Sequence, residues 1–301
     1  MRNKFAQTGS YVTAIQTGPA SGWMVMAMDD VAAKGIDHAG IMKMKDKVLS
    51  PFAMKMFRVC AAAMLPGQQA VFVGDDGQCL VVRGDGSQQA EFVTAGARTP
   101  QNTGHLRSGT RWGDDLLVVG MQRQVYLRTA SGVWTDLMQG LPAPGEGETA
   151  GFEAVAAVGP NEAYAAGWDG ELWACDGARW RRLDSPTNRI VTALGASPDG
   201  QVYGCGRNGS LFKGRHDAWQ TFLDKACPDD LWSIQPFKGH VYAASLRRLY
   251  RITDDEAIEL LDFDPLGADS FGVLITDGET LWSIGAKDVL GFDGQAWSRI
   301  A

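Results

Sequence analysis

Residues Glu162-Ala-Tyr-Ala-Ala-Gly-Trp-Asp-Gly-Glu-Leu-Trp173 contain a short apolar run, a tight turn with glycine, and a second short apolar run. The same arrangement returns in Gly200-Gln-Val-Tyr-Gly-Cys-Gly-Arg-Asn-Gly-Ser-Leu-Phe212. Further copies begin at Gln69, Asp115 and, in weaker form, at His240 and Thr280. Apolar runs joined by Asp-Gly or Asn-Gly are typical of β-hairpins, because these residues accept the positive φ angles of two-residue turns. The repeated unit is therefore predicted to be a hairpin.

The spacing of the copies indicates the architecture. Aligned on the small residue that ends the first run, consecutive copies lie 46, 47, 39, 39 and 40 residues apart; the anchors are Gly74, Gly120, Gly167, Gly206, Ser245 and Gly285. An apolar segment precedes each anchor. An outer segment follows it, and four of these contain tryptophan: Trp134, Trp180, Trp219 and Trp297. Units of about 40 residues that hold four short strands are typical of β-propeller blades.

The first 56 residues determine the number of blades. Residues 11–15 resemble an innermost strand and residues 22–28 a second strand, while residues 41–45 and 47–51 can supply the outer two. Residues 29–40 would then form an enlarged hairpin loop. We predict an all-β, seven-bladed β-propeller that forms one domain over residues 1–301. The alternative is a six-bladed propeller with an N-terminal extension.

Composition limits the classes of partner. The formal charge of −7 argues against general nucleic-acid binding, which needs a basic surface. No stretch approaches 18 uninterrupted apolar residues, and the N-terminus lacks the apolar core of a secretory signal. The five cysteines are scattered and include no Cys-x-x-Cys pair, as expected for reduced, partly buried thiols; they are Cys60, Cys79, Cys175, Cys205 and Cys227. We expect a cytoplasmic protein without membrane insertion.

With the repeat laid out, the chain resembles the broad sialidase-like and photosystem-II-assembly-factor-like bacterial propellers, which are also called WD40/YVTN/BNR-like. The segments Cys175-Asp-Gly-Ala-Arg-Trp180 and Phe292-Asp-Gly-Gln-Ala-Trp297 are similar to degenerate Asp-box turns of that group. The Arg-Ile-Pro element that sialidases place in their active site is missing, and Arg251-Ile-Thr and Arg299-Ile-Ala are the nearest strings. The resemblance implies the fold, and it implies a role beside secreted toxins, as an immunity or accessory protein.

Residue patterns that could carry chemistry have simpler interpretations. The string Gly204-Cys-Gly-Arg-Asn-Gly209 matches a dinucleotide-binding loop, but strand-like residues follow it where the chemistry needs a helix. The four histidines fall in different repeats and have no partner at i+3 or i+4; they are His38, His105, His216 and His240. The carboxylates of Asp262, Asp264 and Asp269 lack the spacing of a calcium loop. We therefore predict no catalytic residues, no cofactor and no metal site.

One set of turns contains several arginines and a tryptophan, although turns are often charged simply because they face water. The turn after each anchor joins the second and third strands of a unit, and we name it the 2–3 turn. The predicted partner-binding residues in these turns are Arg123, Trp168, Asp169, Arg207, Arg247, Arg248 and Lys287. Arg and Trp concentrate binding energy at protein interfaces. Longer segments can add to the same surface, namely residues 98–107, 141–150 and 224–230 between units, and residues 29–40.

These observations favour a non-catalytic, protein-binding propeller, such as an immunity or accessory protein for a bacterial toxin. The expected partner is a toxin or another secreted effector, and the chain is expected to be a monomer. Two alternatives stay open. One is a carbohydrate-binding propeller, which would repeat Trp or Arg at equivalent positions in every unit. The other is a hydrolase or lyase with a site in the central funnel.

Overall fold

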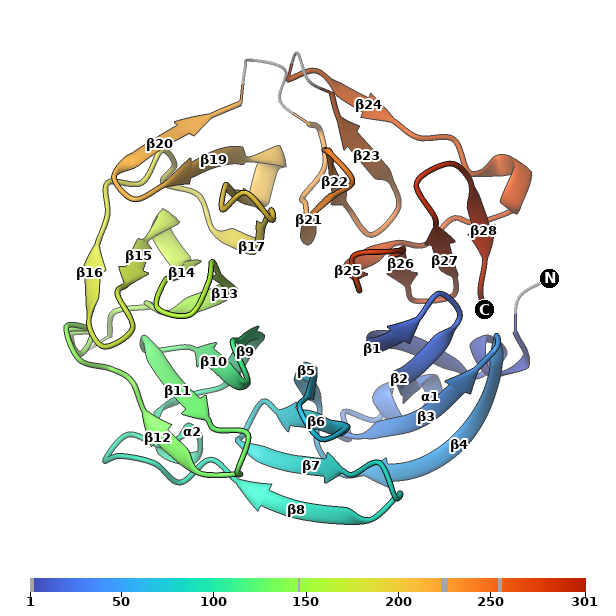
Figure 1. The fold of residues 1–301 in the computed structure, drawn as a ribbon, viewed down its shortest axis with the longest axis horizontal. Coiled ribbons are helices and arrows are strands. Elements are labelled where there is room, and N and C mark those ends of the chain that lie inside the picture. The colour runs from blue at the N-terminus through green and yellow to red at the C-terminus, as the bar shows by residue number, and fades with distance from the viewer. Residues whose placement is uncertain (1–2, 146, 223–226, 254–255) are drawn as a thin grey trace. The chain divides into compact units, whose positions relative to one another are not determined.

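The computed structural model describes residues 3–145, 147–222, 227–253 and 256–301. Its strands form seven separate four-stranded sheets, and in each sheet the strands lie in the order in which they occur in the chain (Figure 1). These sheets are the blades of a seven-bladed β-propeller, so the predicted fold class is confirmed. Within the described residues, no helix is both long and apolar enough to cross a membrane.

Contacts between Cα atoms divide the chain into two compact units. Unit 1 comprises Met1–Val59 and Leu231–Ala301, and unit 2 comprises Cys60–Asp230. Unit 1 therefore contains both ends of the chain and three blades, whereas unit 2 contains the four blades between them.

Unit 1 holds the first, sixth and seventh blades. The first blade consists of β1 (Gly9–Gly18), β2 (Ser21–Met28), β3 (Ala39–Lys45) and β4 (Val48–Lys55). The sixth consists of β21 (Ser233–Phe237), β22 (His240–Ala244), β23 (Leu249–Ile252) and β24 (Ile258–Leu260). The seventh consists of β25 (Gly272–Thr276), β26 (Leu281–Gly285), β27 (Val289–Phe292) and β28 (Trp297–Arg299). The short helices of this unit are η1 (Lys4–Gln7), α1 (Asp29–Ala32) and η4 (Asp264–Leu266).

Unit 2 holds the second to fifth blades. The second blade consists of β5 (Val59–Leu65), β6 (Gln69–Gly74), β7 (Gln78–Val82) and β8 (Gln88–Phe92). The third consists of β9 (Leu106–Trp112), β10 (Asp115–Gly120), β11 (Gln124–Arg128) and β12 (Trp134–Asp136). The fourth blade consists of β13 (Phe152–Ala157), β14 (Ala163–Gly167), β15 (Leu172–Cys175) and β16 (Trp180–Arg182). The fifth consists of β17 (Val191–Ala196), β18 (Val202–Gly206), β19 (Leu211–Arg215) and β20 (Ala218–Thr221). Its short helices are α2 (Pro100–Thr103), η2 (Trp168–Gly170) and η3 (Arg207–Gly209).

The N-terminal residues form a complete blade, as the sequence predicted, and the six-bladed alternative is wrong. The enlarged loop between β2 and β3 contains the single helical turn α1. Within unit 1, β1 lies beside β25 and β26, and the Tyr11 amide donates a hydrogen bond of 2.9 Å to the Ala286 carbonyl. A buried cluster that includes Met24, Met44 and Trp282 fills the space between these strands. The two ends of the chain are thus packed together in one unit.

The turn chemistry agrees with the hairpin prediction. The glycine of each of the seven Asp-Gly pairs has a positive φ, between 68° and 101°. The preceding aspartate closes several of these turns, and Asp293 Oδ1 accepts the amides of Gln295 and Ala296 at 2.7 and 2.8 Å. These amides lower the pKa of the Asp293 carboxyl, because they stabilise its charged form. Similar bonds are made by Asp85, Asp176, Asp199 and Asp277.

Tryptophans of the outer strands pack between neighbouring blades of the same unit. Trp180 in β16 is almost fully buried, and its ring lies 6.0 Å from the ring of Phe152, centroid to centroid. Its indole N–H donates to the Leu137 carbonyl, which belongs to the preceding blade, at 2.9 Å. The ring supplies a large apolar area and its N–H keeps a partner, so this contact fixes one blade against the next.

Candidate functional site

All seven predicted partner-binding residues lie in 2–3 turns. In unit 2, Arg123 lies between β10 and β11, Trp168 and Asp169 lie in η2, and Arg207 opens η3. In unit 1, Arg247 and Arg248 lie between β22 and β23, and Lys287 lies between β26 and β27. The 2–3 turns also contact the loops that enter their blades, since the amide of Trp168 donates to the Gly151 carbonyl and that of Arg207 to the Ile190 carbonyl. Within each unit, these turns and loops form one surface.

Arg123 is buried rather than exposed. Its Nε donates to Glu171 Oε2 at 2.7 Å and its Nη2 to Glu148 Oε1 at 3.0 Å, and its side chain is only 9% exposed. Burial lowers the pKa of Arg123, but hydrogen bonds and charges from Glu171 and Glu148 outweigh this effect and raise it. The residue therefore ties the third blade to the fourth and offers little surface to a partner.

Arg207 and Lys287 also have carboxylate partners, but both side chains are more exposed than that of Arg123. Arg207 Nη1 donates to Asp230 Oδ2 at 2.6 Å within unit 2. The amide of Asn208 and then Arg207 lower the pKa of Asp230. In unit 1, Lys287 Nζ donates to Asp29 Oδ2 at 2.6 Å and to the Gly9 carbonyl at 2.9 Å. The 2–3 turns thus present pairs of opposite charges, which the sequence could not show.

A hollow lies beside Arg247 and Arg248 in unit 1. Its volume is about 410 Å³, and both arginines line it, together with residues of the loop after β24. That loop is acidic, since it contains the carboxylates of Asp262, Asp264 and Asp269. The exposed arginines and the acidic loop therefore form opposite walls of one cleft.

A second hollow lies at the equivalent place in unit 2. Its volume is about 460 Å³, and it lies between η2, which contributes Asp169, and the loop after β16, which contributes Asp184 and Thr187. Trp168, which precedes Asp169 in the chain, is half-buried, and its indole N–H donates to Glu153 Oε1 at 2.8 Å. Each of these clefts is formed by a 2–3 turn and the loop that leaves the same blade.

Polar residues at or just before the start of the third strand of a blade were not predicted from the sequence. Glu171 Oε1 accepts the Gly151 amide at 2.8 Å, and Gln124 donates to the Gly104 carbonyl at 2.8 Å. In the seventh blade, Asp288 Oδ2 accepts the Ser270 hydroxyl at 2.8 Å. In each case a buried side chain holds the loop that enters its blade. The signal in the sequence was a polar residue immediately after a 2–3 turn, at a position where the strand is otherwise apolar and buried.

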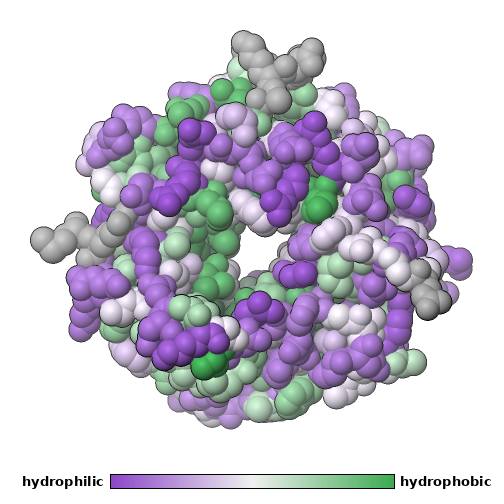
Figure 2. Space-filling view, turned by 180° about the vertical axis from the view of Figure 1, so that it is seen from behind, coloured by the Kyte–Doolittle hydropathy of each residue, from purple (hydrophilic) through white to green (hydrophobic). Residues whose placement is uncertain are grey.

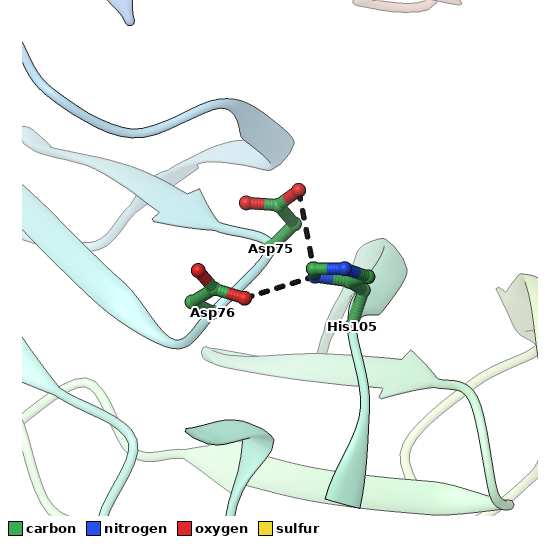
Figure 3. A group of neighbouring side chains, drawn as sticks. All are labelled: Asp75, Asp76 and His105. Carbon is green, nitrogen blue, oxygen red and sulfur yellow. Dashed lines mark ion pairs between the residues drawn. The ribbon is translucent and has the colours of Figure 1, made fainter. Parts of the chain in front are cut away.

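His105 is a further feature of unit 2 that sequence spacing did not reveal. Its Nδ1 lies 2.9 Å from Asp76 Oδ1 and 3.7 Å from Asp75 Oδ2, and both aspartates belong to the 2–3 turn of the second blade (Figure 3). Among the described residues, these three form the one group of His, Cys, Asp or Glu side chains close enough to share a cation. The imidazole already occupies the space between the carboxylates, so the group is an ion pair when His105 is protonated.

The longer segments have different outcomes. Residues 98–107 contain α2, and Arg98 Nη1 donates to the Gln122 carbonyl of a 2–3 turn at 3.2 Å. Residues 141–150 reach Arg123 through Glu148, although residue 146 lies outside the described residues. Within residues 224–230, residues 224–226 also lie outside the described part of the chain.

Comparison with known proteins gives one close relative by sequence. The chain is 38% identical over 236 residues, 78% of this chain and 76% of the relative, to the immune protein Tsi7 of Pseudomonas aeruginosa. A search of protein-family models found no match.

Solved structures resemble the fold at low identity. Virginiamycin B lyase from Staphylococcus aureus, in a catalytically inactive form with quinupristin, superposes with a TM-score of 0.72 at 10% identity, over 97% of this chain and 96% of the lyase. YCF48 bound to D1 peptide superposes with a TM-score of 0.61 at 15% identity, over 81% of this chain and 82% of YCF48. The resemblance to photosystem-II-assembly-factor-like propellers is therefore confirmed at the level of fold.

Proposed function

The chain belongs to the same family as the immune protein Tsi7, and from this premise we propose that it is an immunity protein, which binds a toxin protein and blocks it without catalysing a reaction. The relationship by sequence carries this proposal, because it covers about three quarters of both proteins. The similarity to a lyase does not carry an activity, since one fold serves many functions.

We place the contact with the toxin on the 2–3 turns. In unit 1, the cleft between Arg247, Arg248 and the acidic loop offers both signs of charge within one hollow. In unit 2, Asp169 lines the equivalent cleft and Trp168 is its neighbour in the chain. Arg and Trp beside a concave surface are the usual anchors of tight protein complexes. In unit 2, the buried Arg123 holds the turn between β10 and β11 against Glu171 of the next blade.

The exposed ion pairs of the turns suit a surface that changes partners. Exposed pairs such as Arg207–Asp230 contribute at most about 1 kcal/mol to folding, because water screens them. If a carboxylate of the toxin takes the place of Asp230 as the partner of Arg207, little folding free energy is lost. The new ion pair is shielded from water in the complex, so it is screened less than the exposed pair. Paired charges of both signs also favour one orientation of the partner and exclude others.

The proposal includes a cytoplasmic, monomeric protein. All five cysteines are free and four of them are buried, which suits a reducing compartment. An immunity protein of this kind meets the toxin where the toxin would act.

Co-expression tests the proposal directly. Each protein encoded beside this chain is produced in a laboratory bacterium, alone and together with the chain. We expect one of them to stop growth alone and to be tolerated when the chain is present, and the two proteins to purify as a complex. The double variant Arg247→Glu/Arg248→Glu should reduce the protection, whereas Arg111→Glu, near the end of β9, should not. Absence of any neighbouring toxin that the chain neutralises would overturn the proposal.

A further inference from the structure

An apolar groove crosses the first blade in unit 1. Its volume is about 410 Å³, and its lining includes Phe5, Met26, Met28, Gly40, Met42 and Met54. Met26 and Met42 are buried and form the floor, whereas Met54 is 54% exposed and forms the rim. We name this feature the methionine groove.

Gly40 is the reason that the groove exists. It lies in β3, opposite Met26 of β2 on one side and Met54 of β4 on the other. A Cβ at this position would lie 3.5 Å from the Met26 carbonyl oxygen and 3.8 Å from Met54 Cε, which are ordinary van der Waals contacts, so it would fit without a clash. Any larger side chain here would fill the hollow, and the backbone would accept it.

The rim of the groove is an unusual sheet edge. The outermost strand β4 has eight residues, whereas the outermost strands of the other six blades have three to five. Among the described strands, β4 pairs with β3 alone. Val48, Met54 and Met56 are exposed by 68%, 54% and 67% along or just beyond this strand. Figure 2 shows the face of the protein that is hidden in Figure 1, where apolar residues, in green, lie among many hydrophilic ones, in purple. A long edge with apolar side chains is able to pair with an added strand.

The hairpin that carries this edge is basic in an acidic protein. Residues 39–55 contain one carboxylate, Asp46, and four lysines, Lys43, Lys45, Lys47 and Lys55, while the whole chain has a formal charge of −7. Lys4 precedes Phe5, which lines the groove, and its Nζ lies 5.2 Å from the centre of the Phe5 ring. The charge of this hairpin is thus opposite in sign to that of the whole protein.

We propose that the methionine groove binds an extended, acidic segment of a partner protein, which pairs with β4 and inserts apolar side chains between the methionines. Methionine side chains are flexible and polarizable, so the groove adapts to apolar groups of different shape. Lys43 and Lys45 alternate with Met42 and Met44 along β3, so they face the other side of the sheet and would select acidic residues that alternate with the apolar ones in the added strand. Pro51 lacks an amide proton and divides the edge, so the pairing extends along residues 52–55, next to the groove.

A second copy of this chain does not fit the groove. Pairing two β4 edges would bring together two basic hairpins, each with four lysines and one carboxylate, and the repulsion between like charges would oppose this pairing. The groove also lies apart from Arg247, Arg248 and their cleft, so the proposal does not depend on the immunity role.

A random heptapeptide library, displayed on phage and selected against the purified full chain, tests this proposal. We expect the enriched peptides to alternate carboxylates with apolar residues. Synthesised with a fluorescent label, they should lose affinity at least tenfold with Gly40→Val, which fills the groove, and with Lys45→Glu, which reverses one charge. Their affinity should also fall as salt rises, because salt screens exposed charges. Gly18→Val is the matched control, since nothing lies within 4 Å of its Cβ, and it should leave binding unchanged.

Three outcomes would overturn the proposal. The first is the absence of enriched peptides that respond to Gly40→Val, or enrichment of basic peptides. The second is binding of the chain to phosphatidylserine vesicles without binding to the peptides, which would identify a membrane surface as the occupant. The third is a concentration-dependent dimer that Gly40→Val abolishes, which would identify a second copy. Melting temperatures of both variants that equal that of the wild-type protein show that loss of binding is not loss of folding.

Discussion

Arg123 and Glu171 form a buried ion pair between the third and fourth blades, with 2.7 Å between Arg123 Nε and Glu171 Oε2. Glu171 also accepts the Gly151 amide at 2.8 Å and the Trp173 indole N–H at 3.1 Å. One carboxylate therefore fixes a 2–3 turn, an entering loop and a tryptophan. The surface proposed to bind a toxin depends on this buried support.

Removal of the Arg123 guanidinium should lower the stability of the folded protein. Arg123→Met leaves the Glu171 carboxylate buried without its cation, and we expect the free energy of unfolding to fall by about 3 kcal/mol. The double variant Arg123→Met/Glu171→Gln should recover part of this loss, because the uncompensated charge is gone. Urea denaturation measures both. As a control, Arg181→Met breaks the exposed pair with Asp217 and should cost less than about 1 kcal/mol. Equal losses for Arg123→Met and Arg181→Met would show that the buried pair has no special role.

Gly170 in η2 should not tolerate a side chain. It has a φ of +68°, and a Cβ would lie 2.1 Å from the Thr187 carbonyl oxygen. Gly170→Ala therefore combines a left-handed backbone with a clash, and should reduce the free energy of unfolding by about 3 kcal/mol or more. Gly159→Ala has a φ of +84° with nothing within 4 Å, and should cost about 1 kcal/mol from the backbone alone. Chemical denaturation compares the two, and a similar cost for both would contradict the close approach at Thr187.

The thiols of the folded protein should react slowly. Burial raises the pKa of Cys175 to about 11 and that of Cys205 to about 12, and it also raises the pKa of Cys60 and Cys79. Since the thiolate is the reactive form, few of these groups are reactive at pH 8. We expect slow labelling by a disulfide reagent in buffer and rapid labelling of five thiols in guanidinium chloride. Rapid labelling of Cys205 in the folded state would contradict the buried position of β18.

Acid should destabilise the protein through its turn carboxylates. Backbone amides lower the pKa of Asp176 and Asp293, and Arg215 lowers the pKa of Glu162. A folded pKa below the unfolded value means that the unfolded chain binds more protons as the pH falls. The stabilisation is therefore complete above about pH 5 and is lost below about pH 4, as the pH passes through the folded pKa values. We expect a constant melting temperature from pH 7 to 5 and a steep fall below pH 4. A melting temperature that stays constant down to pH 3 would contradict this expectation.

The hairpins and blades could be predicted because their signals are local. An Asp-Gly pair specifies a turn through the φ of its glycine, as at Gly294 with a φ of +101°, and the repeat then sets the blade. The same logic identified the first blade, whose strands β1 to β4 lie close to the predicted ranges.

The burial of Arg123 could not be predicted, because its cause is remote in sequence. Glu171 lies 48 residues away in the chain, and Asp230 lies 23 residues from Arg207. Turn residues are usually wet, and only the packing of one blade on the next shows which of them is covered. The helical turn α1 was missed for a different reason. Its four residues are too few to show a helical periodicity.

Hydrogen exchange of the complex between this chain and the toxin it neutralises tests the central claim most directly. We predict that complex formation slows exchange in the 2–3 turns at residues 168–170, 207–209 and 246–248, and leaves the hairpin turns at residues 113–114 and 238–239 unchanged. Slower exchange confined to residues 113–114 and 238–239, with no change in the three 2–3 turns, would contradict the proposed binding surface.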